Sequence, residues 1–433
     1  MAVGPLFRLA SAGLVLARAG AFSLVDTETL PAKPRLAIRL ARLFEPRGLT
    51  DGDRAERLVS ALARLGPSYI KLRQFLATRP DIVGKAAAET LGRLRDEMEP
   101  FPDEVARARV AEALGRPVED LFASFSPPVA AASIAQVHRA TVAEAEAAAE
   151  SDLDGEAAPR DVAVKVLRPN VRRRFRDDLA TFYGGARFVE RVDPAVRRLK
   201  PVAVVDTLAR SVAMEMDLRL EAAALSEMAE LTAADPGFRV PKIEWELTAR
   251  DVLTMEWIDG VKLSDLDGLR AAGHDLPELA RRLMQAFLRQ ALRDGFFHAD
   301  MHQGNLFADA AGNIVAVDFG IMGRLGRDER RFLAEILFGF IRRDYRRIAE
   351  VHFEAGYVPD RHTVEDFAQA LRAIGEPIHG QRARDISMAR LLSLLFEVTE
   401  LFDMQTRPEL LLVQKTMVVV EGVSRSLDPD FDM

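Results

Sequence analysis

Three oxygen-bearing side chains at fixed spacing constrain this chain most strongly. Asp300 and Asn305 lie five residues apart, Asp318 follows further along, and the apolar run 314–317 just before Asp318 is typical of a buried strand. Carboxylate and amide oxygens are the ligands that hold Mg²⁺ on phosphates, and a carboxylate beside the attacking oxygen assists phosphoryl transfer. The spacing therefore predicts a phosphate-handling site. Turn residues between a helix and a hairpin are the alternative interpretation.

This spacing is that of a kinase catalytic loop running into an Asp-Phe-Gly turn. The loop would be 298–305, and Asp318 would open the metal-binding turn. Upstream, Lys165 stands in the strand-like run 161–166, where kinases place the lysine that binds the α- and β-phosphates. A lysine on an edge strand is usually just solvated, so this assignment depends on the downstream residues.

The bulk composition narrows the remaining possibilities. A chain of 433 residues is long enough for one large or two medium domains. The absence of cysteine excludes disulfides, thiolate nucleophiles and cysteine-ligated metals. The net charge of −7 does not indicate a nucleic-acid-binding protein. No run approaches the ~20 apolar residues of a membrane-spanning helix, so we expect no transmembrane helix.

The first fifty residues are basic within an acidic chain. They carry seven Lys and Arg residues against three acidic ones, and the apolar run 9–17 is bracketed by Arg8 and Arg18. This pattern predicts an amphipathic helix that rests either on an anionic membrane surface or on another part of the fold.

Hydrophobic periodicity and turn residues outline the rest of the chain. A break at Gly66-Pro67 separates two helices within 54–75, and Ser126, Pro127 and Pro128 mark a turn. The acidic, low-complexity run 143–160 is predicted to be a flexible hairpin loop. We further expect strands at 134–142, 161–167, 239–243 and 251–257, long helices at 170–191 and 201–233, and a mainly helical chain from 277 onward.

A kinase places a glycine-rich loop over the phosphates between its first strands. Here the corresponding residues are Ala130, Ala131, Ala132 and Ser133. Alanine does not readily adopt the positive φ values that glycine allows, so the phosphate cradle must differ. Ser133 is a candidate phosphate donor, and an ordinary strand entry is the alternative interpretation.

Taken in order, these motifs resemble the UbiB-type atypical kinases, a protein-kinase-like family linked to ubiquinone biosynthesis. The resemblance extends over roughly residues 55–325. It is carried by the runs 65–75, 130–133, 161–166, 215–217, 298–305 and 318–320.

The resemblance implies roles for residues that spacing alone does not assign. Lys71 and Gln74 would belong to a signature helix that folds over the nucleotide site, where a protein substrate would otherwise bind. Glu215 and Asp217 would face that helix, and Glu221 would pair with Lys165. Asp300 would be the catalytic carboxylate, Asn305 and Asp318 would bind Mg²⁺, and adenine would lie near Met255, Glu256, Trp257 and Ile258.

The predicted fold is α+β, a protein-kinase-like two-lobe fold with an N-terminal helical extension packed over the nucleotide site. The predicted segments are a basic amphipathic segment 1–50, a helical extension 51–125, an N-lobe 126–260 and a helical C-lobe 261–433.

Three residues depart from the family pattern. Arg73 replaces the glycine of the signature Lys-x-Gly-Gln, and Met301 and Gln303 replace two prolines of the catalytic loop. Because the metal-binding residue types remain, nucleotide binding is expected to persist. Bacterial members of the family commonly end in a hydrophobic, membrane-spanning tail, which residues 427–433 do not resemble.

Several activities are compatible with these motifs. The first hypothesis is an ATP- and Mg²⁺-dependent ATPase or small-molecule kinase, cytoplasmic and peripheral to the inner membrane, acting on a prenylated phenol or quinone lipid with other ubiquinone-biosynthesis proteins. The second is a non-catalytic nucleotide-binding scaffold. An ordinary protein kinase is disfavoured because no Ala-Pro-Glu closes a peptide platform after Asp318. A phosphotransferase of the antibiotic-kinase sort would leave the helix of Lys71 and Gln74 unexplained.

Overall fold

The computed structural model describes residues 5–24, 32–46, 51–77, 90–91, 98–143, 160–192, 200–377, 398, 401–404 and 408–431. Most of the predicted acidic loop, parts of the basic segment 1–50 and the last two residues lie outside these ranges. The chain divides into two compact units. The first comprises Met1–Leu220 with Glu244–Met255, and the second comprises Glu221–Ile243 with Glu256–Met433.

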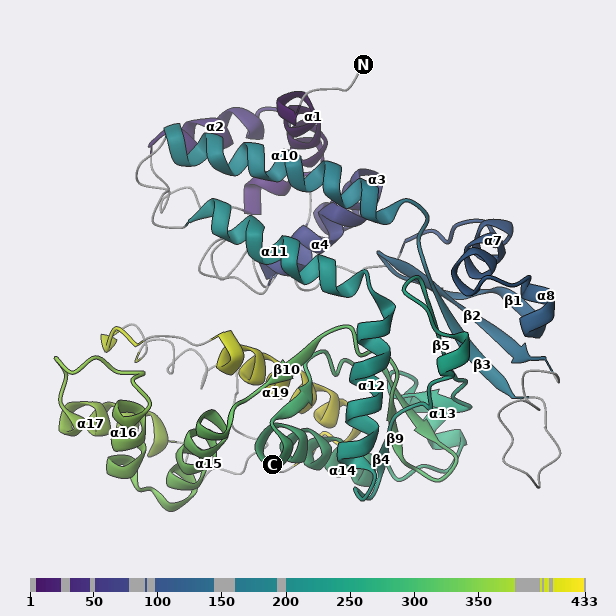
Figure 1. Cartoon of the computed structure of the whole chain (residues 1–433). Helices are drawn as coiled ribbons and strands as arrows, with labels where there is room; N and C mark the ends of the chain where they lie inside the picture. The colour runs from purple at the N-terminus through teal and green to yellow at the C-terminus, as the bar shows by residue number, and fades with distance from the viewer. Residues whose placement is uncertain are drawn as a thin grey trace. The chain divides into compact units, whose positions relative to one another are not determined.

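The N-terminal part of the first unit is a group of packed helices (Figure 1). The predicted break at Gly66-Pro67 is present, because Gly66 has a φ of 102° and ends one helix before the next begins. Helices α10 and α11 run side by side in opposite directions. The helices of this group are α1 (Pro5–Arg18), α2 (Ala32–Arg42), α3 (Asp51–Leu65), α4 (Pro67–Ala77), α10 (Val171–Val192) and α11 (Pro201–Glu215), with the short η1 (Ala21–Leu24).

A four-stranded sheet in the order β1-β2-β3-β5 forms the rest of the first unit. Alternate residues Val162, Val164 and Val166 of β3 are fully buried and join a core with residues of the short helices. The elements are α7 (Asp103–Leu114), α8 (Val118–Leu121), β1 (Phe122–Ala131), β2 (Ala135–Val142), β3 (Asp161–Leu167), η3 (Trp245–Leu247) and β5 (Val252–Glu256).

The predicted turn at Ser126, Pro127 and Pro128 is wrong. These residues lie inside β1, which is the edge strand of the sheet and shifts register against β2 on either side of Pro128. Proline lacks the N–H that a central strand needs, but an edge strand with bulges tolerates it.

The predicted single helix 201–233 is also wrong, because it is broken at Met216 and Asp217. The Leu218 N–H donates to the carbonyl of Arg250 at 3.1 Å, and the Asp217 side chain accepts from the N–H of Arg219. An aspartate that accepts from a nearby N–H in this way starts a new helix. Glu215 therefore ends α11, and Glu221 lies in the first turn of α12 (Leu218–Thr232).

The second unit contains a four-stranded sheet in the order β4-β9-β8-β6, a β10-β7 pair and several helices. Helix α14 packs along α19, and α15, α16 and α17 form a further group with its own buried core around Tyr345 and Phe367. The elements are β4 (Phe238–Arg239), β6 (Gly260–Lys262), α13 (Leu266–Ala271), α14 (Leu276–Leu288), η4 (Arg289–Asp294), β7 (Phe296–His298), β8 (Leu306–Asp309), β9 (Ile314–Ala316), β10 (Met322–Arg324), α15 (Arg327–Arg342), α16 (Tyr345–Glu354), α17 (Val364–Gly375) and α19 (Pro408–Leu427).

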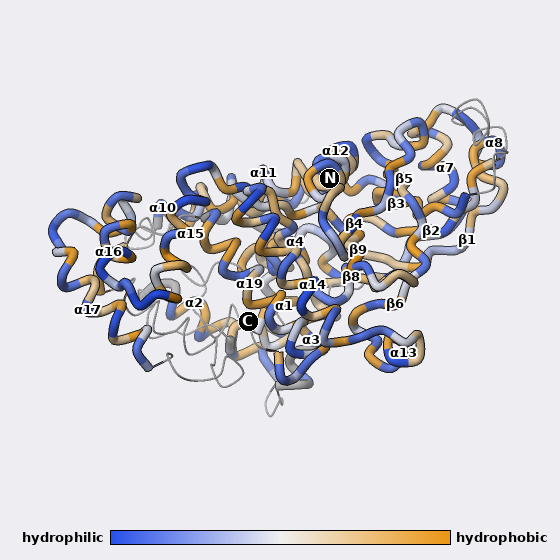
Figure 2. The backbone as a smooth tube through the Cα atoms, turned by 90° about the horizontal axis from the view of Figure 1, so that it is seen from below, coloured by the Kyte–Doolittle hydropathy of each residue, from blue (hydrophilic) through white to orange (hydrophobic). Residues whose placement is uncertain are grey.

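Hydrophobic and hydrophilic residues alternate along most of these helices (Figure 2). This alternation is the pattern of helices that bury one face against their neighbours. Within the described ranges, no helix combines the length and the apolar character needed to cross a membrane.

Candidate active site

The predicted catalytic loop lies in the second unit between β7 and β8. Strand β7 is fully buried and pairs antiparallel with β10, so that His298 faces Met322. At the other end of the loop, Leu306 pairs with Ala316 of β9. Two strand pairs therefore fix both ends of a short loop that carries Asp300 and Asn305.

His298 is the buried anchor of this loop. Its Nδ1 accepts a hydrogen bond from the Asp300 N–H at 3.0 Å, so the neutral ring carries its hydrogen on Nε2. Nε2 is directed to the backbone of Asp318 without ideal hydrogen-bond geometry, and the ring meets the Phe319 ring edge-on at 4.8 Å. Complete burial lowers the pKa of His298, which favours the neutral ring.

Asn305 is oriented by the loop's own backbone. Its side-chain Nδ2 donates to the Asp300 carbonyl at 3.3 Å, and its backbone N–H donates to the His302 carbonyl at 2.9 Å. With the amide nitrogen directed at a carbonyl, Oδ1 is the side-chain atom left for a cation.

Asp318 follows β9 at the start of the Asp-Phe-Gly turn. The N–H of Val317 donates to the Asn305 carbonyl at 3.1 Å, which ties the segments of the two predicted metal ligands together. Asp318 Oδ1 accepts from the Gly320 N–H at 3.2 Å, and Phe319 N–H donates to Glu221 Oε1 of α12 at 3.4 Å. Glu221 is thus attached to the turn as well as being the predicted partner of Lys165.

The donor set fits Mg²⁺ on a nucleotide. Asn305 and Asp318 supply amide and carboxylate oxygens, and Mg²⁺ on phosphates usually takes only one or two protein ligands besides phosphate and water. Among the described residues, no group of three or more His, Asp or Glu side chains is arranged to hold a metal by itself.

The first unit holds Lys71 of α4 in an ion pair with Glu215 at the end of α11. Only 12% and 10% of the two side chains are exposed, so the charges are mostly buried. Gln74 lies half-buried one turn further along α4. Glu215 therefore faces the signature helix α4 directly.

Asp217 has different partners. It accepts hydrogen bonds from Arg219 Nε at 2.9 Å and Nη2 at 2.7 Å, and Arg250 lies 3.7 Å away. The hydrogen bonds from Arg219 lower the pKa of Asp217. Glu215 and Asp217, which the family resemblance pairs, therefore have different charged partners. Arg219 and Arg250 were not predicted as partners of Asp217.

The alanine-rich segment forms a tight hairpin end between β1 and β2. Ala131 pairs with Gln136, and the Ala132 N–H donates to the Ala135 carbonyl at 2.8 Å. None of the four predicted residues is among the non-glycine residues of positive φ in the described chain. Ser133 is buried, and Arg168 Nε donates to the Ala132 carbonyl at 3.0 Å.

Lys165 lies on β3 opposite Val137 of β2, with its side chain largely buried. It belongs to the first unit and Glu221 to the second, so the pairing of these two residues stays a prediction.

The predicted adenine segment begins where β5 ends. Met255 is buried, and Trp257 Nε1 donates to Asp259 at 3.1 Å. The Glu256 carboxylate accepts from Arg239 Nη1 at 3.0 and 3.1 Å, so this side chain serves a structural ion pair and only its backbone is suited to adenine. Ile258 is buried in the second unit.

Two buried polar residues of the second unit support the catalytic loop and were missed from sequence. Gln290 lies in the π-helical η4, and its Oε1 accepts from the His298 N–H at 3.2 Å. Thr416 of α19 donates to the Ala299 carbonyl at 3.2 Å. Neither residue had a clear sequence signal, because each directly follows a charged residue, and the partner of Thr416 lies 117 positions away in the sequence.

Comparison with known proteins decides the family. Residues 93–352 match the ABC1 atypical kinase-like domain, and residues 371–432 match the UbiB helical domain. A probable protein kinase UbiB of Marinobacter nauticus is 39% identical over 435 residues, which covers 99% of this chain and 76% of the relative. The chain belongs to the UbiB family of ABC1 atypical kinase-like proteins.

Other relatives of this UbiB-family chain agree. A probable protein kinase UbiB of Pseudomonas aeruginosa is 39% identical over 393 residues, covering 90% of this chain and 71% of the relative. The solved structure of the Rv3197–erythromycin complex from Mycobacterium tuberculosis has a TM-score of 0.56 at 24% identity and covers 92% of this chain and 95% of that one. The family resemblance and the kinase-like fold are confirmed.

Within the UbiB pattern, two of the three departures of this chain are buried, and the third, Gln303, is half-buried. Arg73, which replaces the signature glycine, is 4% exposed and donates to the Leu91 carbonyl. Its burial lowers its pKa to about 10. Met301, which replaces a proline, is fully buried.

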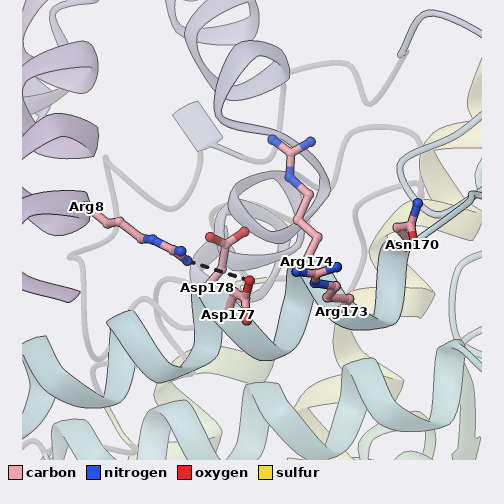
Figure 3. A pocket seen from close by; sticks show the side chains of 6 residues that line it. All are labelled: Arg8, Asn170, Arg173, Arg174, Asp177 and Asp178. Carbon is pink, nitrogen blue, oxygen red and sulfur yellow. Dashed lines mark ion pairs between the residues drawn. The ribbon is translucent and has the colours of Figure 1, made fainter. Parts of the chain in front are cut away.

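A charged pocket of about 520 Å³ lies against α10 in the first unit and contains none of the predicted site residues (Figure 3). Arg174 donates from the same helix to the Leu65 carbonyl at 2.7 Å, and burial raises the pKa of Asp178. The fully buried Ser68 hydroxyl lies near Asp178 without a well-formed hydrogen bond. Arg174 and Asp178, which line the pocket, therefore lie against the junction of α3 and α4 at Leu65 and Ser68. It is lined by Arg8, Asn170, Arg173, Arg174, Asp177 and Asp178.

Proposed function

We propose that this chain is an ATP- and Mg²⁺-dependent enzyme, an ATPase or small-molecule kinase, that supports synthesis of prenylated quinone lipids such as ubiquinone at a membrane surface. The observation that carries the proposal is that the loop and the turn are joined: Asn305 Nδ2 donates to the Asp300 carbonyl, and the N–H of Val317, next to Asp318, donates to the Asn305 carbonyl. Membership of a family whose relatives are named UbiB supports the quinone part.

Each residue has a chemical role in this proposal. Lys165 would bind the α- and β-phosphates with Glu221 orienting it, and the turn 130–133 would cover them. Asn305 and Asp318 would hold Mg²⁺, which neutralises charge on the phosphates. Asp300 accepts the proton of the attacking oxygen.

The segment after the Asp-Phe-Gly turn supports a small substrate rather than a peptide. Strand β10 is paired with β7 up to Arg324, and α15 begins at Arg327. Little chain is left for a peptide-docking platform. An ordinary protein kinase, the activity in the names of the relatives, is therefore the less favoured alternative.

The deciding experiment is Mg²⁺-dependent ATP hydrolysis by the purified chain and by Asp318→Asn. We expect at least a ~100-fold loss of turnover in the variant, because an amide holds Mg²⁺ more weakly than a carboxylate. The melting temperature without nucleotide should not change. Tight ATP or ADP binding without turnover in the wild-type chain would favour the non-catalytic scaffold instead. Unchanged turnover in Asp318→Asn would refute the metal assignment.

Helix α2 supports the membrane part of the proposal. Leu36 and Leu40 of α2 and Leu43 and Phe44 of the turn directly after it recur at helical spacing and are 53–76% exposed. The opposite side is attached to η1, since Arg42 Nε donates to the Phe22 carbonyl at 3.1 Å. The helix sequence contains Lys33, Arg35, Arg39 and Arg42 and no acidic residue. An apolar stripe on a basic helix fits an anionic bilayer surface.

Vesicle co-sedimentation tests this surface. The double variant Leu40→Glu/Leu43→Glu should bind vesicles with anionic lipid at least about tenfold more weakly, since two apolar contacts are lost and two negative charges are added. Val129→Glu is the matched control, because Val129 is similarly exposed at 53% on the edge strand β1. If both changes weaken vesicle binding equally, or if neither weakens it, binding through α2 is contradicted.

A further inference from the structure

His302 lies in the catalytic loop two residues after Asp300 and has no role in the proposed function. Its ring is fixed by the Gly304 N–H, which donates to Nδ1 at 3.0 Å. A ring nitrogen that accepts a hydrogen bond carries no hydrogen, so the neutral imidazole has its hydrogen on Nε2. Nε2 lies 3.8 Å from Asp300 Oδ2. The donor nitrogen of His302 is therefore presented to the carboxylate that would accept the proton.

The loop is built to keep the ring in this place. A Cβ atom at Gly304 would lie 2.8 Å from Cε1 and 2.9 Å from Nδ1 of His302, so a side chain there would displace the ring. Hydrogen bonds also hold the backbone of His302 on both sides. Its N–H donates to the Asp300 carbonyl and its carbonyl accepts from the Asn305 N–H, both at 2.9 Å.

The ring and the carboxylate both remain accessible to reactants. The side chains of His302 and Asp300 are 51% and 37% exposed, in contrast to the fully buried His298. His298 accepts from the Asp300 backbone and so fixes where the residue lies in the loop. It does not fix how the Asp300 carboxylate is turned, which leaves that task to a group near Oδ2.

We propose that His302 is the positioning residue for the Asp300 carboxylate, an inference that rests on the proposed function. When nucleotide binds, the Nε2–H closes onto Oδ2 as a hydrogen bond, and Oδ1 is left facing the attacking oxygen. Hydrogen bonds at catalytic groups are often long in the free enzyme and tighten in the substrate complex.

The hydrolytic step shows why this orientation matters. The oxygen of water forms a bond to the γ-phosphorus while the bond from that phosphorus to the bridging oxygen breaks. ADP leaves with the electron pair of the broken bond, and the proton of the water passes to Asp300 Oδ1. A carboxylate held by one oxygen presents the other in a single direction, and correct orientation of a reacting group is worth orders of magnitude in rate.

Two substitutions separate the contacts of the ring. In His302→Asn, the amide oxygen lies near the position of Nδ1 and accepts from the Gly304 N–H, but the side chain does not reach Asp300. In His302→Gln, the longer side chain brings an N–H close to the position of Nε2, where it donates to Asp300. Because the native side chain is half exposed, neither change should move the melting temperature by more than about 2 °C.

Steady-state ATP hydrolysis is measured for wild type, both His302 variants and Asp318→Asn. We expect His302→Asn to lose about tenfold to 100-fold in kcat with KM within about threefold, and His302→Gln to stay within about threefold in both. The reverse order, with Asn active and Gln impaired, would show that the ring only holds Gly304. Equal loss in both variants, or wild-type rates in both, would also overturn the positioning role.

The control variant separates failure of this inference from failure of the proposed function. If the wild-type chain hydrolyses ATP and Asp318→Asn does not, while His302→Asn matches wild type, only the role of His302 falls. If the wild-type chain shows no Mg²⁺-dependent turnover at all, both the proposed function and the role of His302 are refuted.

Discussion

The catalytic loop and the signature helix hold their polar side chains by different means. In the loop, the Asn305 side chain donates to the Asp300 carbonyl and the Asp300 N–H donates to His298, all within a short stretch of chain. On α4, Lys71 is held by the carboxylate of Glu215, which comes from a distant part of the chain. Local backbone contacts set geometry at little electrostatic cost, whereas a buried ion pair leaves an unpaired charge when either partner is removed.

This contrast predicts where substitutions act. Changes in the catalytic loop should lower turnover more than stability, because the loop side chains Asp300 and His302 are partly exposed. Changes at Lys71 or Glu215 should lower stability first.

The first prediction concerns the buried pair. Lys71→Met or Glu215→Met alone should each lower the free energy of unfolding by about 3 kcal/mol, because the remaining charge is left buried without its partner. The double variant Lys71→Met/Glu215→Met should recover most of that loss, since it leaves no unpaired charge and two apolar side chains of suitable size. Calorimetric unfolding of the four proteins gives the coupling between the two side chains.

An exposed pair in the second unit is the matched control. Arg346 Nε lies 3.2 Å from Glu350, and the side chains are 67% and 37% exposed. Arg346→Met should cost less than about 1 kcal/mol. If the control costs as much as Lys71→Met, or if the double variant is no better than the single ones, the buried pair is not what stabilises this part of the first unit.

The second prediction concerns the corner that starts the signature helix. Gly66 has a φ of 102°, and a Cβ atom there would lie 2.2 Å from Arg174 Nη2. Gly66→Ala should therefore cost about 1–3 kcal/mol from backbone strain alone, before the guanidinium moves away. Gly13 of α1 is the contrasting position, because nothing lies within 4 Å of its Cβ position. Gly13→Ala should stabilise by about 0.5–1 kcal/mol.

Unfolding midpoints in denaturant compare the two alanine variants. If Gly66→Ala and Gly13→Ala shift the midpoint in the same direction, the corner between α3 and α4 is not held by the conformation of Gly66. A partial rescue of Gly66→Ala by Arg174→Ala would identify the guanidinium as the source of the steric part.

The conformation of the loop 298–305 depends on contacts that are local in sequence, and its catalytic role stays a prediction. The spacing of Asp300, Asn305 and Asp318 reflects hydrogen bonds that close within the loop and the strand pair beside it. The helix break at Gly66 was predictable for the same reason.

Features decided by distant contacts were not predictable. The break before α12 depends on the Arg250 carbonyl, and the strand through Pro127 and Pro128 depends on its edge position in the sheet. Turn propensity indicated the wrong structure there, because edge placement removes the penalty of a missing N–H.

The last and smallest effect is a pH dependence of stability, expected in both units. Burial lowers the pKa of His138 in the first unit and of His352 in the second. In the unfolded chain a histidine takes up a proton as the pH falls through about 6.5, whereas the folded neutral ring does not. The stability that each ring contributes is therefore complete above that pH and is lost as the pH falls below it.

His352→Phe keeps the edge contacts with Tyr357 and Phe367 and removes the titration. The melting temperature of His352→Phe should fall less between pH 7.5 and 5.5 than that of the wild-type chain, and the remaining fall should include the part due to His138. If the melting temperatures of the two proteins differ by the same amount at pH 7.5 and at pH 5.5, His352 is not held neutral in the folded chain. The acid sensitivity would then have to come from other groups.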